Sequence, residues 1–154
     1  MVSRKDNMTT KSHKTAIARS GPSSPLLTLE KMGLINGEVL DYGCGKGADE
    51  KYLMSKNISI DSYDPHWKPV DLKGKKYDTI LCTYVLNVLD DADGRVVISS
   101  VKERLNPNGK AYLSVRRDVK TDGPTSRGFQ RNVLLDYPVV KERKNNYCIY
   151  ELSA

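Results

Sequence analysis

The most constraining feature of the chain is a set of three alternating glycines that directly follows a short apolar segment. The run is Asp41-Tyr42-Gly43-Cys44-Gly45-Lys46-Gly47, and the flanking residues 38–41 and 48–56 read as a strand and a helix. Glycine lets a backbone turn sharply and approach a ligand closely. The free N–H groups at the start of the following helix suit an anionic group. The pattern therefore predicts a ligand-binding turn at the start of an α/β sheet.

A second strand, expected over 58–63, and a carboxylate behind it complete a βαβ unit. A helix between two strands implies a parallel, right-handed crossover. Asp64 follows the second strand, where a carboxylate typically accepts hydrogen bonds from ribose hydroxyls. Asp61 is the alternative, but it alternates with Ile58 and Ile60 inside the strand. Asp41 ends the first strand, where a carboxylate can accept from an ammonium group.

Three further segments predict a sheet with helices on both faces. Residues 78–85 form a continuous apolar and β-branched run, which is typical of a buried strand. Residues 91–105 repeat apolar side chains every four positions from Val97, as an amphipathic helix does. Ahead of the first strand, Ser24-Pro25 predicts a short helix with Ser24 as its N-cap and an end at Gly33.

The C-terminal third predicts strands rather than helices. The strands that we expect there cover 111–115, 133–140 and 147–152, with 106–109 as a turn and 121–128 as a loop. The last two strands flank a polar turn at 141–146 and form an antiparallel hairpin, edged by Pro138. A strand near Val70 and Leu72 is either very short or absent. The order of elements predicts an α/β fold: a three-layer α/β/α, Rossmann-like domain whose mostly parallel sheet ends in an antiparallel hairpin.

The same glycines also satisfy a dinucleotide-binding fingerprint. Gly43, Gly45 and Ala48 match G-x-G-x-x-G/A, which is weak evidence when it stands alone. Two features argue against a dehydrogenase. The 154 residues leave no room for a hydride-acceptor domain, and the sequence closes with a hairpin rather than another βαβ half. A glycine turn that binds no ligand is the remaining alternative.

The net charge of +6 is concentrated near the N-terminus. Residues 1–20 carry five basic side chains against Asp6 alone, a net charge of +4, and 1–12 lack any periodicity. We expect 1–12 to be a disordered basic tail ahead of one domain over 13–154. The tail is either a solvated segment without a partner or an arm that meets the phosphates of DNA or RNA.

The sparse cysteines and the lack of a long apolar run favour a cytoplasmic protein. Cys44, Cys82 and Cys148 are sparse and unpaired in sequence, which indicates reduced thiols, and all three read as packing residues rather than nucleophiles. With two histidines and no cluster of metal-ligand spacing, we expect no metal site. No apolar run approaches the roughly 20 residues of a membrane span, so we expect no membrane contact.

Taken in order, four segments resemble the class I S-adenosylmethionine-dependent methyltransferases. They are VLDYGCGKGAD (39–49), SYDP (62–65), YDTILCTYVLNVLDD (77–91) and RLNPNGKAYLSV (104–115). In that family they correspond to the glycine loop, the ribose carboxylate, the fourth strand and the turn before the fifth strand. The resemblance covers residues 38–116 and implies a methyltransferase that uses S-adenosylmethionine (SAM) as its cofactor.

A narrower resemblance involves further segments. HKTAIARS (13–20), YDPHWKP (63–69) and GFQRN (128–132) are similar to the methyltransferases associated with DNA phosphorothioation gene clusters and to their small phage relatives. This resemblance implies a nucleic acid or a nucleotide as the methyl acceptor. Two alternatives stay open: a non-catalytic SAM-binding or DNA-associated accessory protein, and a small-molecule methyltransferase.

The resemblance also implies roles for the residues of the glycine loop. Gly43, Cys44 and Gly45 would pass beneath the methionyl part of the cofactor, and Asp41 would lie near its ammonium group. Asp64 would bind the ribose hydroxyls.

Cofactor contacts are implied outside the glycine loop as well. Pro65 and His66 would lie near the adenine, and Tyr84 and Val85 would line the methyl-donor side. Arg19 would reach the cofactor carboxylate or a phosphate. In the contracted region that follows, Asp71 is a weak candidate for a further adenine contact.

No familiar catalytic motif follows the fourth strand. Residues 83–87 lack the [DNS]-P-P-[YFW] motif of amino-methylating enzymes, and the Pro-Cys pair of cytosine-C5 enzymes is absent from the sequence. Methyl transfer needs proximity and in-line alignment more than acid–base chemistry, so this absence does not exclude an enzyme. The catalytic candidates are Tyr84, Asn87 and His66. Asn87 either orients a substrate or caps a turn, and His66 is either a general base or a packing residue beside Trp67.

Basic and amide side chains of the C-terminal half are further candidates. Arg116 and Arg117 leave the strand over 111–115 on the crevice side, where they either anchor an acidic substrate group or are solvated. Gln130 and Arg131 belong to a loop with the reach to cover the site.

Overall fold

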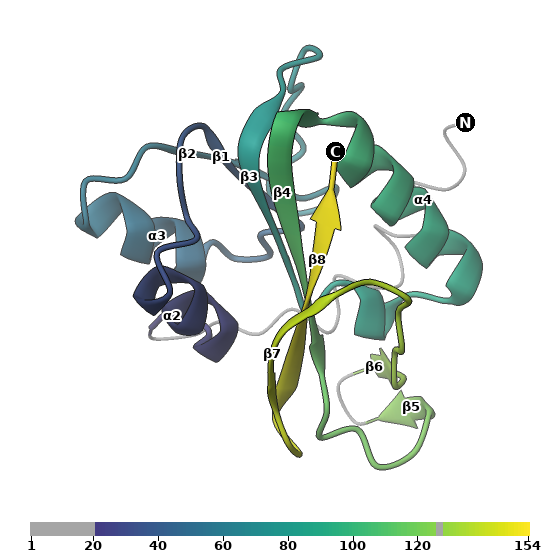
Figure 1. Ribbon diagram of the computed structural model, residues 1–154. Helices are drawn as coiled ribbons and strands as arrows, with labels where there is room; N and C mark the ends of the chain where they lie inside the picture. The colour runs from purple at the N-terminus through teal and green to yellow at the C-terminus, as the bar shows by residue number, and fades with distance from the viewer. Residues whose placement is uncertain (1–20, 126–127) are drawn as a thin grey trace.

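The computed structural model describes residues 21–125 and 128–154, which build a six-stranded mixed sheet between helices (Figure 1). The strands of this sheet are β1 (Val39–Tyr42), β2 (Ile60–Tyr63), β3 (Tyr77–Thr83), β4 (Leu105–Arg116), β7 (Val139–Arg143) and β8 (Tyr147–Ser153). Their order across the sheet is β2-β1-β3-β4-β8-β7. The first four are parallel, β8 is antiparallel to β4, and β7 is antiparallel to β8. The predicted α/β fold, a mostly parallel sheet with an antiparallel C-terminal hairpin, is confirmed.

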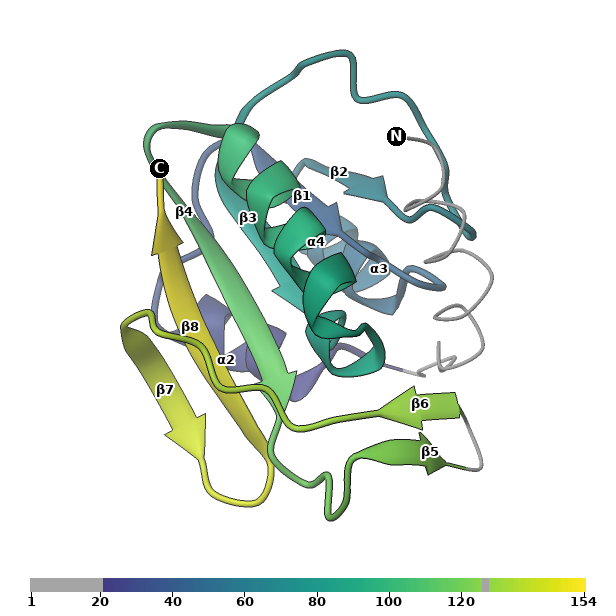
Figure 2. The same ribbon diagram turned by 90° about the vertical axis from the view of Figure 1, so that its right-hand side faces the viewer.

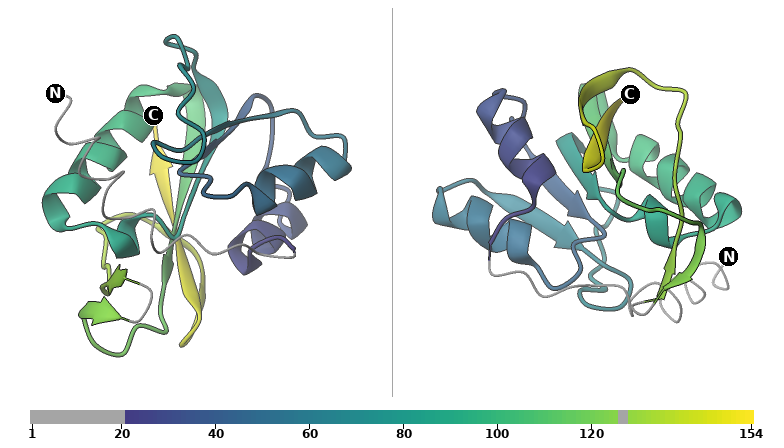
Figure 3. Two further views of the ribbon diagram at one scale, coloured as in Figure 1. Left: turned by 180° about the vertical axis from the view of Figure 1, so that it is seen from behind. Right: turned by 90° about the horizontal axis from the view of Figure 1, so that it is seen from below.

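Helices cover both faces of the sheet. α2 (Ser24–Lys31) and α3 (Ala48–Ser55) lie on one face and α4 (Asp91–Glu103) on the other, as Figures 2 and 3 show. Side chains of β3 alternate between the two layers: Leu81 packs with α2 and α3, whereas Ile80 and Cys82 pack with α4. Burial on both faces is the reason why β3 reads as a continuous apolar run.

The N-cap of α2 lies one residue earlier than the sequence predicts. Ser23, not Ser24, accepts the hydrogen bond from the N–H of Leu26, and Pro25 occupies the first turn. Ser23 also donates its hydroxyl and its backbone N–H to the carboxylate of Asp49 on α3, at 2.8 and 2.7 Å. This tertiary contact explains the shift, because it fixes Ser23 between the two helices.

The segment predicted as a strand over 133–140 pairs with the sheet only at its end. Val133 is 3% exposed, and Leu135 and Tyr137 pack against the core on the α4 side, but pairing begins at Val139. Residues 133–138 therefore bury apolar side chains as an extended connection. The polar turn is also shorter than expected, since Lys141 to Arg143 belong to β7 and only 144–146 form the turn.

Two other connections differ from the expectation. Residues 106–109 are not a turn outside the sheet but an irregular stretch of β4, where the register with β3 shifts and Asn108 has a φ of 66°. The loop expected over 121–128 contains a short hairpin of β5 (Gly123–Thr125) and β6 (Gly128–Gln130).

Among the residues that the structure describes, 64–76 form a connection without a strand, so the third strand is absent rather than very short. β2 therefore stands at the edge of the sheet (Figure 2). The helices within 21–125 and 128–154 are too short or too polar to cross a lipid bilayer.

Candidate functional site

The glycine loop lies at the carboxyl ends of β1 and β2, where open α/β sheets bind ligands. The N–H of Gly43 donates to the carbonyl of Tyr63 at 2.7 Å and so fastens the loop to the end of β2. Gly43, Gly45 and Gly47 have φ angles of 82°, 56° and 85°, which residues with side chains rarely adopt. A Cβ on Gly43 would lie 2.4 Å from Cγ2 of Val85. The loop backbone therefore passes directly against the segment that follows β3.

Asp64 joins the glycine loop to the segment after β2. Its Oδ2 accepts from the N–H of Gly45, and its Oδ1 accepts from the N–H groups of His66 and Trp67, each at 2.9 Å. A carboxylate has about four acceptor positions, so backbone donors occupy most of them. The carboxylate is therefore a support of the loop itself, a role that the sequence reasoning missed. The signal was the Asp64-Pro65 pair, since Asp side chains often bond to the backbone that follows them in turns.

Asp61, the alternative to Asp64, faces another part of the molecule. Its Oδ2 accepts from Nζ of Lys75 at 2.8 Å and from the hydroxyl of Tyr77 at 2.7 Å, on the outer side of β2. The hydrogen bond from Lys75 lowers the pKa of Asp61. Asp71 lines the same outer region. The geometry thus places Asp64, and not Asp61, at the glycine loop.

A cation–π contact and an ion pair connect the glycine loop and α3 to residues 66–68. Nζ of Lys46 lies 5.0 Å from the centre of the Trp67 ring, and Nζ of Lys68 lies 2.8 Å from Oε2 of Glu50. The exposed ring of His66 stands edge-on to Trp67, with the ring centres 4.8 Å apart. This contact agrees with the packing alternative for His66. The sequence carries no local signal for such pairs, because they join segments that only the fold brings together.

Carboxylates give the glycine loop a negative surrounding. Burial, followed by the charges of Asp41, Asp64 and Glu50, raises the pKa of the Cys44 thiol to about 12. The thiol therefore stays protonated near neutral pH and is a poor nucleophile. Asp41 itself is only 3% exposed. A negative potential of this kind favours a ligand with positive groups.

The other two cysteines lie in the core between the sheet and α4. Burial raises the pKa of Cys82 to about 12, and burial also raises the pKa of Cys148. Cys44, Cys82 and Cys148 are all free thiols. These surroundings agree with the interpretation of the cysteines as packing residues.

We expect the free energy of unfolding to fall as the pH rises above about 9, and Cys82 to contribute to that fall. In the unfolded chain this thiol ionises near its ordinary pKa of 9.0, whereas in the fold it stays protonated up to about 12. The unfolded state then loses a proton that the folded state keeps, which costs about 1.4 kcal/mol per pH unit. Urea unfolding between about pH 8 and about pH 10 measures the slope, which should be shallower in Cys82→Ala. Equal slopes in the two proteins would contradict this account.

The chain turns sharply after β3. Tyr84 has a φ of 62°, which is unusual for a bulky residue, and its N–H donates to the carbonyl of Ser114 on β4 at 2.8 Å. Backbone strain of this kind costs about 1–3 kcal/mol and clusters at functional sites. The turn directs the chain across the carboxyl ends of the strands and sets Val85 against Gly43. Val85 therefore lies beside the glycine loop. That Tyr84 and Val85 line the methyl-donor side of a cofactor stays a prediction.

Asn87 is fully buried and holds three segments together. Its Nδ2 donates to the carbonyl of Arg131 at 2.8 Å, and its Oδ1 accepts from the N–H of Arg116 at 2.7 Å. The N–H of Arg131 donates back to the carbonyl of Asn87 at 2.9 Å. Because backbone groups bind both ends of the side-chain amide, the geometry supports a capping role rather than contact with a substrate.

The two arginines at the end of β4 differ in their surroundings. Arg117 donates to the carbonyl of Val133 at 2.7 Å and to the hydroxyl of Tyr150 at 2.6 Å, so it is part of the packing under β8. Arg117 also forms an ion pair with Glu142 at 3.1 Å, but its two other hydrogen bonds hold it in place. Arg116 forms a bidentate ion pair with Asp118, at 2.8 and 2.7 Å. Arg116 is the one of the two that can exchange its partner for a substrate anion.

Gln130 and Arg131 lie next to the segment that follows β3. β6 packs against the short helix η2 (Leu86–Val88), and Arg131 donates to the carbonyl of Leu89 and pairs with Asp91 at 2.9 Å. The expected basic tail over 1–12 and Arg19 lie outside the described residues. Within 21–125 and 128–154 no cluster of histidine, cysteine and carboxylate side chains could hold a metal ion.

Several solved methyltransferases share this fold. A SAM-dependent methyltransferase from Bacteroides fragilis, in complex with S-adenosylhomocysteine, has a TM-score of 0.61 at 13% identity, over 91% of this chain and 80% of that one. The glycopeptide N-methyltransferase MtfA has a TM-score of 0.55 at 17% identity, over 85% of this chain and 78% of that one. Magnesium protoporphyrin IX methyltransferase (ChlM) from Synechocystis PCC 6803 has a TM-score of 0.52 at 17% identity, over 83% of this chain and 75% of that one. The chain spans only 51% of the length of a protein solved in work on echinomycin biosynthesis.

A family model describes the chain more directly. The model of a methyltransferase domain matches residues 17–152, nearly the whole sequence. No curated protein sequence matches the chain. The family match, the sheet order and the position of the glycine loop agree with one another, and related structures have been solved with SAM or S-adenosylhomocysteine. The chain therefore belongs to the SAM-dependent methyltransferase family.

Proposed function

We propose that this chain binds SAM at the glycine loop and transfers its methyl group to a small-molecule acceptor. The observation that carries the proposal is the fit of the loop to such a cofactor. Gly43, Gly45 and Gly47 have positive φ angles, which turn the loop backbone sharply at the end of β1. Gly47, the N-cap of α3, adds no capping side chain at the start of that helix. When bound, SAM supplies an electrophilic methyl group on a positively charged sulfur.

The charges around the glycine loop support the same fit. SAM carries a sulfonium and an ammonium group, and the charges of Asp41, Asp64 and Glu50 act on the loop strongly enough to help raise the pKa of Cys44, against the opposing charge of Lys68. Asp41, at the end of β1, is the proposed partner of the ammonium group. Asp64 has room for one further donor, a ribose hydroxyl, in addition to its three backbone bonds.

The segment after β3 is the proposed acceptor side of the site. The strained turn at Tyr84 and the contact of Val85 with Gly43 hold this segment against the loop. Such fixed surfaces orient an acceptor in line with the methyl group and exclude water, which is the main requirement of methyl transfer. Arg116, through its exchangeable ion pair, is a candidate anchor for an acidic acceptor.

The proposed acceptor class rests on the names of the structural relatives. MtfA is a glycopeptide N-methyltransferase and ChlM methylates magnesium protoporphyrin IX, and the chain covers most of both. The competing proposal is a nucleic-acid acceptor, as in the methyltransferases of DNA phosphorothioation clusters. The net charge of +4 on residues 1–20 favours it. The three free thiols make a reducing cytoplasm the proposed compartment.

Transfer of a radioactive methyl group from SAM to a panel of acceptors tests the proposal. The panel contains a glycopeptide, magnesium protoporphyrin IX, short duplex DNA and transfer RNA, with Asp64→Ala at a low SAM concentration as the weak-binding control. We expect label in a small molecule and none in the nucleic acids. Label in DNA or RNA alone would support the nucleic-acid acceptor. Cofactor binding without transfer to any acceptor would support the non-catalytic accessory.

A further inference from the structure

Two segments near the C-terminal hairpin carry an excess of positive charge. Residues 116–120, where the chain leaves β4, have the sequence RRDVK, and residues 141–146, where β7 turns into β8, have the sequence KERKNN. Each segment has a net charge of +2, and residues 21–154 as a whole also have a net charge of only +2. The remainder of 21–154 therefore has a net charge of −2, so the positive charge is concentrated in these two segments.

The two segments lie side by side at one end of the sheet, since Figures 1 and 2 both place the turn between β7 and β8 beside the connection from β4 to β5. The N–H of Arg117 donates to the carbonyl of Asn146 at 2.9 Å. Tyr147 of β8 pairs with Arg116 on one side and with Arg143 on the other. The two arginines are thus two strand spacings apart, roughly 10 Å, on the same face of the sheet. We call residues 116–120 and 141–146 the basic surface.

Most of the basic side chains on this surface have no acidic partner. Arg116 pairs with Asp118, and Arg117 pairs with Glu142. The others are exposed and form no ion pair within 21–125 and 128–154: Lys120, Lys141, Arg143 and Lys144. The excess charge is therefore accessible to an anionic partner.

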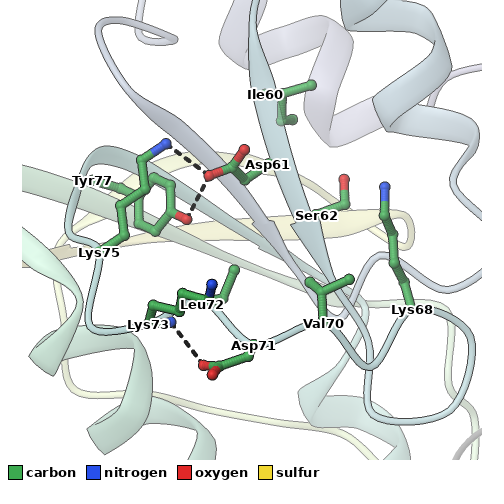
Figure 4. Close-up of a pocket in the computed structure, with 10 residues that line it drawn as sticks. All are labelled: Ile60, Asp61, Ser62, Lys68, Val70, Asp71, Leu72, Lys73, Lys75 and Tyr77. Carbon is green, nitrogen blue, oxygen red and sulfur yellow. Dashed lines mark hydrogen bonds and ion pairs between the residues drawn. The ribbon is translucent and has the colours of Figure 1, made fainter.

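The lysines near β2, at the opposite edge of the sheet, differ in this respect. Nζ of Lys75 lies 2.8 Å from Oδ2 of Asp61, toward which it points (Figure 4), and Nζ of Lys68 lies 2.8 Å from Oε2 of Glu50. Because carboxylates balance these lysines, that edge does not select an anion. The basic surface does, because its charge is unbalanced.

We propose that the basic surface binds the phosphate backbone of a nucleic acid. Lysine, arginine and asparagine side chains are among the groups that contact phosphates, and Asn145 and Asn146 are exposed beside the basic residues. The basic surface contains no aromatic residue, and Val119 is its one apolar residue. The cores of protein–protein interfaces are rich in aromatic and poor in charged side chains, so this composition favours a nucleic acid over an acidic protein. Without an aromatic ring for a base to stack on, we expect contact with the backbone and no reading of sequence.

The N-terminal charge joins the structure at the same end of the sheet. Ser23, near the start of the described chain, is bonded to Asp49 in the first turn of α3, directly behind the glycine loop. Residues 1–20, with their net charge of +4, are connected to the structure there. The inference concerns a binding partner, so it does not depend on which molecule accepts the methyl group.

Binding of a fluorescently labelled DNA duplex to the full chain, without SAM, tests the inference. Lys120→Gln, Lys141→Gln and Lys144→Gln, combined in one variant, remove three of the proposed phosphate contacts. Each contact contributes about 0.9 to the slope of log K against log salt concentration, so the slope between about 50 and 200 mM salt should become shallower by about 2–3. Affinity at the lowest salt concentration should fall at least about tenfold.

The matched control changes the net charge equally at exposed lysines of α2, α3 and α4: Lys31→Gln, Lys51→Gln and Lys102→Gln. This variant should keep the slope of the unaltered chain within about 0.5. Arginine at the three positions of the basic surface keeps the charge and should also keep the slope, which separates lost charge from lost folding.

Three results would overturn the inference. The first is a chain that does not bind the duplex at low salt. The second is an equal slope in the basic-surface variant and the control variant, since overall charge or residues 1–20 would then account for the binding. The third is a polyglutamate peptide of equal charge that binds as tightly as the duplex, because an acidic protein would then be the partner.

Discussion

Asp64→Ala is expected to lower the affinity for SAM by on the order of 100-fold. The substitution removes the acceptor for three backbone N–H groups, those of Gly45, His66 and Trp67, and with it the proposed ribose contact. Hydrogen bonds to a charged group contribute about 1.5–3 kcal/mol each, so the loss of loop order and of one ligand contact gives this magnitude. Asp64→Asn keeps one acceptor oxygen and should lose less. Calorimetric titration with SAM measures each affinity.

The matched control for this experiment is Asp61→Asn, which changes a carboxylate of the same strand region. Asp61 bonds to Lys75 and Tyr77 at the sheet edge and makes no hydrogen bond to the glycine loop. Its substitution should leave SAM affinity unchanged within about twofold, the usual spread of surface substitutions. Should Asp61→Asn weaken SAM binding as much as Asp64→Ala, the assignment of the ribose carboxylate would be wrong.

Gly43→Ala is expected to destabilise the fold by about 2–5 kcal/mol. The new methyl group would lie 2.4 Å from Cγ2 of Val85, and the φ of 82° is unfavourable for alanine. The first effect costs about 1–3 kcal/mol as overpacking, and the second about 1–2 kcal/mol as backbone strain. Urea unfolding measures the sum.

A double-mutant cycle separates the two contributions in Gly43→Ala. Val85→Ala removes the colliding Cγ2, so it should recover the overpacking part in the Gly43→Ala background and leave the backbone strain. We expect a coupling free energy of at least about 1 kcal/mol between the two positions. Additive effects, within about 0.5 kcal/mol, would show that the loop does not pass against Val85 as described.

The sequence was sufficient to predict what local chemistry dictates. The glycines at 43, 45 and 47 occupy backbone conformations that other residues rarely adopt, so their spacing predicts the turn directly. The continuous apolar run within residues 78–85 reflects a strand that is buried on both faces, and the apolar side chains at every fourth position from Val97 reflect one buried helix face. These regularities explain why the sheet, its flanking helices and the position of the glycine loop could be predicted.

Features that depend on distant contacts could not be predicted in the same way. Residues 133–138 are apolar because they cover the core, and burial without pairing gives the same pattern as a strand. Asn87 follows a strand as an ordinary polar residue would, yet its side-chain amide forms hydrogen bonds with the backbone of Arg116 and Arg131, which are distant in sequence. The position of β2 at the edge of the sheet follows from the absence of a strand within 64–76, which no single residue predicts.

Equilibrium binding of SAM to the purified chain tests the central claim most directly. We expect one SAM to bind per chain, with S-adenosylhomocysteine competing for the same site, and the affinity to fall on the order of 100-fold in Asp64→Ala but not in Asp61→Asn. The carboxylates around the glycine loop should favour SAM, with its charged sulfur, over S-adenosylhomocysteine. A chain that binds neither compound, or binds SAM equally well without Asp64, would contradict the proposed site.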